Sequence, residues 1–297
     1  MTVQATLWST ASIESVAPCV VCGSPLYLDA AANTLSCAAC ECKDAMPGGS
    51  GTASLGNDCF LELHAGAVDC KMLAALARAR KCESALVPSA CHTDAATAAA
   101  AVFAELREEI AWAYHNDVLP DGRLVTQPRS IAYQSDDAAL VYAYEGIAAP
   151  LEPVPFTPCV RSLKMQVEKL CGGMAFNSAH LNLYSDGSEH VSWHTDEDTE
   201  LYGDTPLIAS VSFGAEREFV LRRMSGEPYS DLWRPCEPRE HTKYVLRDSD
   251  VLVMRGATQR HFEHAVLKAG RDARGPRINI TFRLARPRHG PRPTAAP

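Results

Sequence analysis

Two histidines and one aspartate in the second half of the chain have the types and spacing that suit a divalent metal. His194 and Asp196 stand two residues apart, and His264 follows much later in the sequence. On a strand, residues i and i+2 face the same side, so His194 and Asp196 can reach one ion. Two imidazoles and one carboxylate leave open positions on octahedral iron(II), which oxygen chemistry requires. His261 is a rival third ligand, but on a strand it would face away from His264.

A second polar pattern predicts a site for a small acid. In the segment 277–283, polar side chains alternate with Ile and Phe, which predicts a strand with one polar and one apolar face. Two inward guanidiniums would need carboxylate partners, and a dicarboxylate can supply them by bidentate pairing. The alternative is an exposed strand whose polar face meets water. The residues that we expect to hold the acid are Asn182, Tyr184, Arg277, Asn279, Thr281 and Arg283.

Taken together, these motifs resemble those of the AlkB family of oxidative nucleic-acid dealkylases, and especially its animal DNA- and RNA-repair branch. The resemblance covers about residues 92–288 and implies a double-stranded β-helix that uses iron(II) and 2-oxoglutarate. It implies that His194, Asp196 and His264 hold the iron, and that the polar residues named above hold 2-oxoglutarate. The matching segments are 182–187, 193–198, 206–214 and 276–283, together with His264.

The resemblance also implies how an alkylated base is held. The segment 127–129 looks like the nucleotide-recognition lid of the family. Tyr133 would stack on or border the base, and Arg129 and Arg222 would lie near the substrate strand. Glu197 or Asp198 would contact the exocyclic amine, and such a carboxylate favours the positively charged alkylated base.

The implied reaction is demethylation of bases such as 1-methyladenine and 3-methylcytosine in DNA or RNA. It consumes O₂ and 2-oxoglutarate and releases formaldehyde, succinate and CO₂. Relatives that open duplex DNA use an apolar finger before the lid, where this chain has Val118-Leu119 and no aromatic residue. We therefore expect single-stranded nucleic acid as the partner, because no base pair must then be broken.

The elements that must position these residues follow from periodicity and turn signals. Helices are predicted over 95–114 and 158–171, with another possible over 67–81, and Gly, Pro and Ser predict a linker over 46–58. Short strands dominate after residue 138, which favours an α+β, mainly β, jelly roll with supporting helices. The strands are expected over 139–144, 180–184, 207–213, 218–222, 251–254 and 277–284. The predicted divisions are a zinc-ribbon-like module (1–45), a linker and cysteine-containing connector (46–91), the dioxygenase domain (92–288) and a tail (289–297).

Two cysteine pairs near the start predict a zinc site. Cys19 and Cys22 form one knuckle and Cys37 and Cys40 another, a spacing typical of four thiolates around tetrahedral zinc. Cys42 is an alternative fourth ligand, and reduced, unliganded thiols are the alternative to a metal site. This module is a candidate surface for nucleic acid or a protein partner.

Bulk properties narrow the classes of function. The net charge of −8 in 297 residues and a pI near 5.7 argue against a broad polyanion binder. No apolar run reaches the roughly 18 residues that cross a bilayer, and the start does not read as a secretory signal. We expect a nuclear or cytoplasmic enzyme without a membrane partner. The other hypotheses are an oxygenase of a protein or small molecule, and a zinc-ribbon adaptor whose oxygenase fold is inert.

Overall fold

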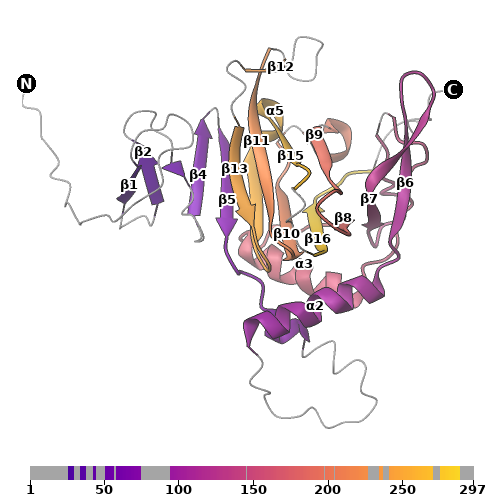
Figure 1. The fold of residues 1–297 in the computed structure, drawn as a ribbon, viewed down its shortest axis with the longest axis horizontal. Helices are drawn as coiled ribbons and strands as arrows, with labels where there is room; N and C mark the ends of the chain where they lie inside the picture. The colour runs from indigo at the N-terminus through magenta and orange to yellow at the C-terminus, as the bar shows by residue number, and fades with distance from the viewer. Residues whose placement is uncertain are drawn as a thin grey trace, which may run out of the picture.

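The computed structural model contains two antiparallel sheets that pack against each other, with helices on the outer face of the larger sheet (Figure 1). It describes residues 26–29, 34–37, 43–44, 51–56, 58–74, 94–144, 146–196, 198–203, 205–226, 234–236, 241–269 and 275–287. The larger sheet has the order β4 (Gly51–Gly56), β5 (Cys59–His64), β14 (Val251–Gly256), β10 (Ile208–Gly214), β16 (Arg277–Arg283), β8 (Ser178–Tyr184), β7 (Leu124–Gln134), β6 (Ala113–Val118).

The smaller sheet closes the other side of the fold. Its order is β12 (Arg234–Pro235), β11 (Arg217–Ser225), β15 (Phe262–Val266), β9 (Val191–His194), with β13 (His241–Leu246) beside β11. The helices with defined bounds are α2 (Ala95–Glu109), α3 (Pro158–Leu170), α4 (Thr199–Tyr202) and α5 (Thr258–His261). Residues 70–74, within the segment 67–81 where a helix was expected, are also helical. The mainly-β jelly roll expected from the sequence is confirmed. None of the helices in the described ranges has the length and apolar character needed to cross a bilayer.

Strand β16 shows how the alternation in the sequence becomes two different surfaces. Ile278, Ile280 and Phe282 join the core under α2 and α3. The four polar residues that alternate with them along the strand line a cavity between the sheets. All seven residues of the strand are buried. The alternative of a polar face in water is therefore wrong, and the two arginines are inward as predicted.

Helix α2 is shorter than its composition suggests. Asp94 caps its start by accepting a hydrogen bond from the Thr97 amide at 2.9 Å, and the helix ends at Glu109. Ile110 is already extended, with φ −96° and ψ 132°, and β6 begins at Ala113. The prediction of a helix to residue 114 is wrong because pairing with β7 outweighs local helix propensity.

Two other expectations also fail on strand pairing. The predicted linker contains β4, and β5 follows it and pairs with β14 along its whole length, so residues 51–64 extend the larger sheet. The strand expected over 139–144 is reduced to one isolated bridge, between Tyr142 and Leu151. The other predicted strands appear within two residues of their expected bounds, except that β11 ends three residues later than expected, and α3 ends one residue early.

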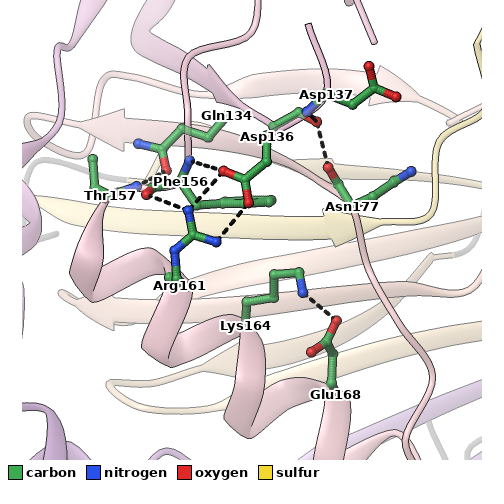
Figure 2. A network of polar contacts seen from close by, with 10 residues as sticks. Gln134, Asp136, Asp137, Phe156, Thr157, Arg161, Lys164, Glu168 and Asn177 are labelled. Atoms are coloured by element: carbon green, nitrogen blue, oxygen red, sulfur yellow. Dashed lines mark hydrogen bonds and ion pairs between the residues drawn. The ribbon is translucent and has the colours of Figure 1, made fainter. Parts of the chain in front are cut away.

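A polar network fixes the start of α3 against the end of β7 (Figure 2). Arg161 donates to both carboxylate oxygens of Asp136, at 2.7 and 2.8 Å, and also to the carbonyl of Phe156. Gln134, the last residue of β7, accepts from the Thr157 amide at 3.1 Å. The network therefore connects the helix that covers the sheet to the strand that carries the predicted lid.

The predicted zinc module falls largely outside the description. Residues 26–44 contain a small sheet of order β1 (Leu26–Asp29), β2 (Thr34–Cys37), β3 (Lys43–Asp44). Cys37 ends β2, and its backbone pairs with Leu26. Its side chain, and Cys19, Cys22, Cys40 and Cys42, lie outside the described residues, as does the predicted tail over 289–297.

Candidate active site

His194, Asp196 and His264 come together at the open edge of the smaller sheet. His194 ends β9 and is the register partner of His264 on β15, and their ring centroids are 4.2 Å apart. One ligand atom from each of the three residues lies within 4.8 Å of the others. His261 ends α5 instead and is not in this cluster. The arrangement has the two imidazoles and one carboxylate of a facial triad.

Hydrogen bonds and ring packing from neighbouring residues orient these three side chains. The Nδ1 of His194 lies 2.8 Å from the Ser192 carbonyl, which leaves Nε2 free to face a metal. The amide of Asp196 donates to Oε1 of buried Gln259 at 2.9 Å. The ring of Phe219 stacks on His264 with centroids 5.3 Å apart. A backbone carbonyl of β9 and side chains of β11 and α5 thus hold the cluster in place.

Asp196 has one committed and one free carboxylate oxygen. Its Oδ1 accepts from Nη2 of Arg283 at 2.7 Å, and its Oδ2 is buried without a hydrogen bond from any described residue. Burial would raise the pKa of Asp196, but the charge of Arg283, with the neighbouring imidazoles and the hydrogen bond from Arg283, holds it below its usual range. A buried, charged, unpaired oxygen beside two imidazoles fits a cation.

The cluster opens into a cavity of about 720 Å³ between the two sheets. All six residues predicted to hold the acid line this cavity: Asn182, Tyr184, Arg277, Asn279, Thr281 and Arg283. Their donors are not equally free. Asn279 donates to Ser210 and to the Val211 carbonyl, and Thr281 donates to Asn279 at 3.1 Å. These two side chains therefore brace the sheet as well as line the cavity.

Arg277 is the clearest site for an anion. It is 1% exposed, and its Nη2 donates to Ser212 at 2.9 Å, while its Nε and Nη1 have no hydrogen bond within the described part of the chain. Its guanidinium carbon is 5.3 Å from the ring centroid of Tyr184. Burial lowers the pKa of Arg277. A carboxylate from a ligand would satisfy both free donors, so the residues fit a dicarboxylate such as 2-oxoglutarate.

Arg283 and Arg129 contact parts of the site that the sequence did not predict. Arg283 is paired with the metal-cluster residue Asp196, so binding of 2-oxoglutarate by Arg283 stays a prediction. Arg129 donates through Nε to Asn182 at 2.7 Å, which connects the predicted lid to the predicted acid site. The Nη1 of Arg129 also lies 3.5 Å from the His190 carbonyl.

The predicted base contact of Tyr133 needs correction. Tyr133 is 4% exposed and does not line the cavity. Its ring lies against Tyr142, with centroids 5.4 Å apart, and Tyr142 lines the cavity instead. Tyr142 in turn is 5.1 Å from His180, which also lines the cavity. Tyr142 and His180, which we call the aromatic wall, therefore form one pair among the aromatic residues that line the cavity.

The other predicted substrate residues have mixed positions. Asp198 lines the cavity and caps α4 by accepting from the Leu201 amide at 2.9 Å. Arg222 does not line it; its guanidinium lies 4.4 Å from the ring centroid of Trp193 and pairs with Glu263, and both of these do line it. Glu197 lies outside the described residues.

The hairpin of β6 and β7 projects from the sheet beside this cavity (Figure 1). Val118 and Leu119, the expected finger, are half-buried. Among the large hydrophobic side chains of the hairpin, Leu124 is 62% exposed, Tyr114 54% and Val125 43%. The exposed aliphatic surface therefore lies after the turn, on Leu124 and Val125, whereas the exposed aromatic ring of Tyr114 lies near the start of β6.

Several cavity residues escaped the sequence reasoning. They lie on strands, in loops and at the end of α4, and they form no metal-binding motif: Asp117, Tyr142, Tyr144, His180, Tyr202 and Glu263. The alternating aromatics at 142 and 144 were the one available signal, and they were interpreted only as a strand. His180 shares the cavity face of β8 with Asn182 and Tyr184, two and four residues away, so a count by twos could have found it.

Comparison with known proteins agrees with this geometry. The family model described as the 2OG-Fe(II) oxygenase superfamily matches residues 89–283. "DNA oxidative demethylase ALKBH2" of Arabidopsis thaliana is 36% identical over 174 residues, 55% of each chain. "Alpha-ketoglutarate-dependent dioxygenase alkB homolog 3" of Bos taurus is 36% identical over 189 residues, 63% of this chain and 61% of its own.

A third relative is matched over more of its length. "DNA oxidative demethylase ALKBH2" of Mus musculus is 32% identical over 190 residues, which are 63% of this chain and 74% of its own. The chain therefore spans between about half and three quarters of the length of these three relatives.

Proposed function

This chain belongs to the 2OG-Fe(II) oxygenase superfamily and, within it, to the AlkB family, and from that premise we propose that it oxidatively removes alkyl groups from nucleic-acid bases. The substrates proposed are N-methylated bases such as 1-methyladenine and 3-methylcytosine. The observation that carries the proposal is that three features lie in one cavity: the His194, Asp196 and His264 cluster, the two free donors of Arg277 and the aromatic wall.

Iron(II) and 2-oxoglutarate are the cofactors of the superfamily, and each has a fitting set of residues here. His194, Asp196 and His264 would hold the iron, and Arg277 with Tyr184 would hold one carboxylate of 2-oxoglutarate. Together with O₂, the bound pair supplies oxidation of an N-methyl group, which is then lost as formaldehyde, with succinate and CO₂ as co-products.

The chain itself contributes binding, orientation and charge. Arg283 keeps Asp196 ionised and aimed at the cluster. Tyr142 and His180 offer ring faces to a planar base, and burial keeps His180 neutral by lowering its pKa well below the usual value. Asp198 would favour a cationic alkylated base over a neutral one, since a nearby negative charge stabilises a positive one where water is scarce.

We propose single-stranded nucleic acid as the preferred substrate. The hairpin beside the cavity exposes Leu124 and Val125, and its tip at 119–123 carries no aromatic residue to fill the gap left by an extruded base. Opening a duplex costs a few kcal/mol by unpairing and unstacking, and a single strand avoids most of that cost.

The direct test is mass spectrometry of oligonucleotides that carry 1-methyladenine or 3-methylcytosine, after incubation with iron(II), 2-oxoglutarate and O₂. Single-stranded and duplex DNA and RNA are the separate arms. We expect loss of one methyl group and release of formaldehyde, with His194→Ala inactive. Turnover of 2-oxoglutarate without demethylation of any oligonucleotide would instead favour a protein or small-molecule substrate.

The predicted zinc site stays a separate proposal. Four thiolates from Cys19, Cys22, Cys37 and Cys40 would make a small module whose folding depends on the ion. Elemental analysis of the purified chain should give one zinc, and Cys19→Ser with Cys22→Ser should lose it. Zinc content that is unchanged in this double variant would rule out the assignment.

A further inference from the structure

A bulge in the hairpin of β6 and β7 turns one polar side chain into the cavity. β6 and β7 pair Tyr114 with Ser130 and Asn116 with Thr126, so residues 127–129 stand opposite a single residue. Bulges next to active sites redirect side chains, and Pro128 adds to the break because it has no N–H for the ladder. Gln127 in this bulge is 3% exposed and lines the cavity.

The orientation of the Gln127 amide is fixed by its neighbours. Its Nε2 donates to Oδ1 of Asp117 at 2.9 Å and to the hydroxyl oxygen of Tyr144 at 2.6 Å. The Tyr144 hydroxyl in turn donates to the same Asp117 oxygen at 2.6 Å. A carboxylate only accepts hydrogen bonds, so the amide must turn its nitrogen toward Asp117 and its oxygen away.

Tyr144 is a dependable donor within this triad. Burial and the hydrogen bond with Asp117 raise the pKa of Tyr144 above its ordinary value. Its hydroxyl therefore keeps its proton at neutral pH, and the three side chains form a closed set of donors and acceptors. Of the buried polar side-chain atoms in these three residues, Oε1 of Gln127 is the one without a hydrogen bond from the described residues.

Oε1 of Gln127 is buried and accepts no hydrogen bond from any residue that the structure describes. A buried acceptor without a donor is unfavourable, so such an atom in a cavity wall marks the place of a ligand donor. This atom lies next to the aromatic wall, because the Gln127 amide is hydrogen-bonded to Tyr144. The ring centroid of Tyr144 is 5.8 Å from that of Tyr142, which in turn is 5.1 Å from that of His180. A planar base against this wall would bring its edge groups close to Gln127.

We propose that Gln127 is a specificity-determining residue whose Oε1 accepts a hydrogen bond from the exocyclic amino group of the alkylated base. Cytosine and adenine carry an amino group where thymine and guanine carry a carbonyl oxygen. A carbonyl facing Oε1 would set two acceptors against each other without a proton between them. This inference rests on the proposed function and deepens it, since it names the bases that the site prefers. The amino group has two hydrogens, so Gln127 and Asp198 can both accept from it.

The test compares kcat/KM for 3-methylcytosine and 3-methylthymine in otherwise identical single-stranded DNA oligonucleotides. The full-length chain should prefer 3-methylcytosine. In Gln127→Leu, which has similar size but no acceptor, activity on 3-methylcytosine should fall roughly 10- to 100-fold, as for loss of one hydrogen bond to a charged group. Activity on 3-methylthymine should stay level or rise, so the ratio of the two should fall at least about tenfold.

Tyr144→Phe is the matched control. It removes one hydrogen bond of the Gln127 amide, while the bond from Nε2 to Asp117 still turns Oε1 the other way, so kcat/KM should change by the same factor for both lesions. Equal losses on both lesions in Gln127→Leu would mean that the residue only braces the hairpin, and would overturn the proposal. Thermal unfolding of both variants checks that each one folds.

Two further experiments distinguish a failure of the proposed role of Gln127 from a failure of the proposed function. The same lesions are tested in RNA, since a loss confined to RNA would assign the donor to the ribose 2′-hydroxyl and overturn the amino-group contact. If the unmodified chain demethylates no oligonucleotide, the proposed function fails. Fluorescence anisotropy of the same oligonucleotides with iron(II) and 2-oxoglutarate under nitrogen then decides the inference alone, by whether Gln127→Leu abolishes the preference for 3-methylcytosine.

Discussion

Arg283 and Asp196 form a buried ion pair in which Nη2 lies 2.7 Å from Oδ1 and both side chains are 8% exposed. The guanidinium holds one oxygen of a predicted metal ligand and leaves the other free. The free oxygen therefore has a fixed direction before any ion arrives. The pair places a positive charge beside the two histidines and holds the pKa of Asp196 below its usual range.

Arg283→Met should weaken iron(II) binding about 10- to 100-fold, the usual effect of removing a group that orients a metal ligand. The measurement is metal titration under nitrogen. Arg255→Met is the control, because Arg255 also pairs with a carboxylate, that of Glu62 at 2.6 Å, on the far strands of the larger sheet. Equal affinities in the Arg283 variant and the unmodified chain would contradict the role of the pair.

Arg277→Met should raise the KM for 2-oxoglutarate by roughly 30- to 1000-fold, because two charge-assisted hydrogen bonds to a carboxylate are lost. Succinate formation reports the KM. Ser212→Ala removes only the protein partner of Arg277 and should have an effect of less than about tenfold. An unchanged KM in Arg277→Met would move the acid site elsewhere in the cavity.

Tyr142→Leu should raise the KM for a methylated oligonucleotide about 5- to 100-fold, since stacking of one base on an aromatic ring contributes roughly 1–3 kcal/mol. Tyr133→Phe should differ little from the unmodified chain, because its buried hydroxyl has no hydrogen bond among the described residues and its ring lies behind Tyr142. The reverse order of effects would return the base contact to Tyr133.

The metal-free protein should lose stability as the pH falls below about 6.5. Burial, helped by the charge of His194, lowers the pKa of His264 to about 3, whereas an imidazole in the unfolded chain titrates near 6.5. Between these values the unfolded chain binds a proton that the folded chain does not. Each unit by which the pH falls therefore lowers the free energy of unfolding by up to about 1.4 kcal/mol through His264. Above about pH 7 the contribution is constant.

Urea unfolding in the presence of a chelator, from about pH 5 to 8, measures this dependence. In His264→Gln, the free energy of unfolding should fall less steeply as the pH drops below about 6.5, and it should not vary with pH near pH 8. His180, which burial also keeps neutral, should contribute a slope of the same sign. A stability that rises on acidification through this range would contradict the buried neutral imidazoles.

Gly256→Ala should destabilise the fold by roughly 2–4 kcal/mol through backbone strain and a clash. Gly256 has φ +63°, and an added Cβ would overlap the carbonyl oxygen of Asp58, which joins β5 to the end of β14. Gly122 has φ +82° at the hairpin tip with no atom within 4 Å of an added Cβ, so Gly122→Ala isolates the φ cost of about 1 kcal/mol. Equal effects in thermal unfolding would show that β5 is not tightly joined to the sheet.

Residues with a strict period could be placed from the sequence. Arg277 and Arg283 were predicted inward because a period of two leaves little freedom once one face is apolar. His194 and His264 were predicted together because few residue types bind iron. In both cases short-range chemistry and periodicity agree, so no knowledge of distant contacts was needed.

The predictions that failed concern residues whose positions depend on partners far along the chain. The segment 51–56 has the composition of a linker, and only pairing with β5 makes it a strand. Tyr133 and Tyr142 have the same side chain, and only tertiary packing decides which one meets the cavity. The pairing of Arg283 with Asp196 was missed because the motif alone suggests that both arginines serve one ligand.

The three residues of the hairpin bulge are held by paired strands on both sides, while the metal cluster and Arg277 are carried by β9, β15 and β16. We therefore expect substitution of Gln127 to alter which base is accepted without shifting the register of these strands, whereas Arg129 in the same bulge also contacts Asn182 of the predicted acid site. This separation makes the hairpin a natural site of divergence: paralogues could exchange lesion preference through one or two mutations there and retain an intact oxidative centre.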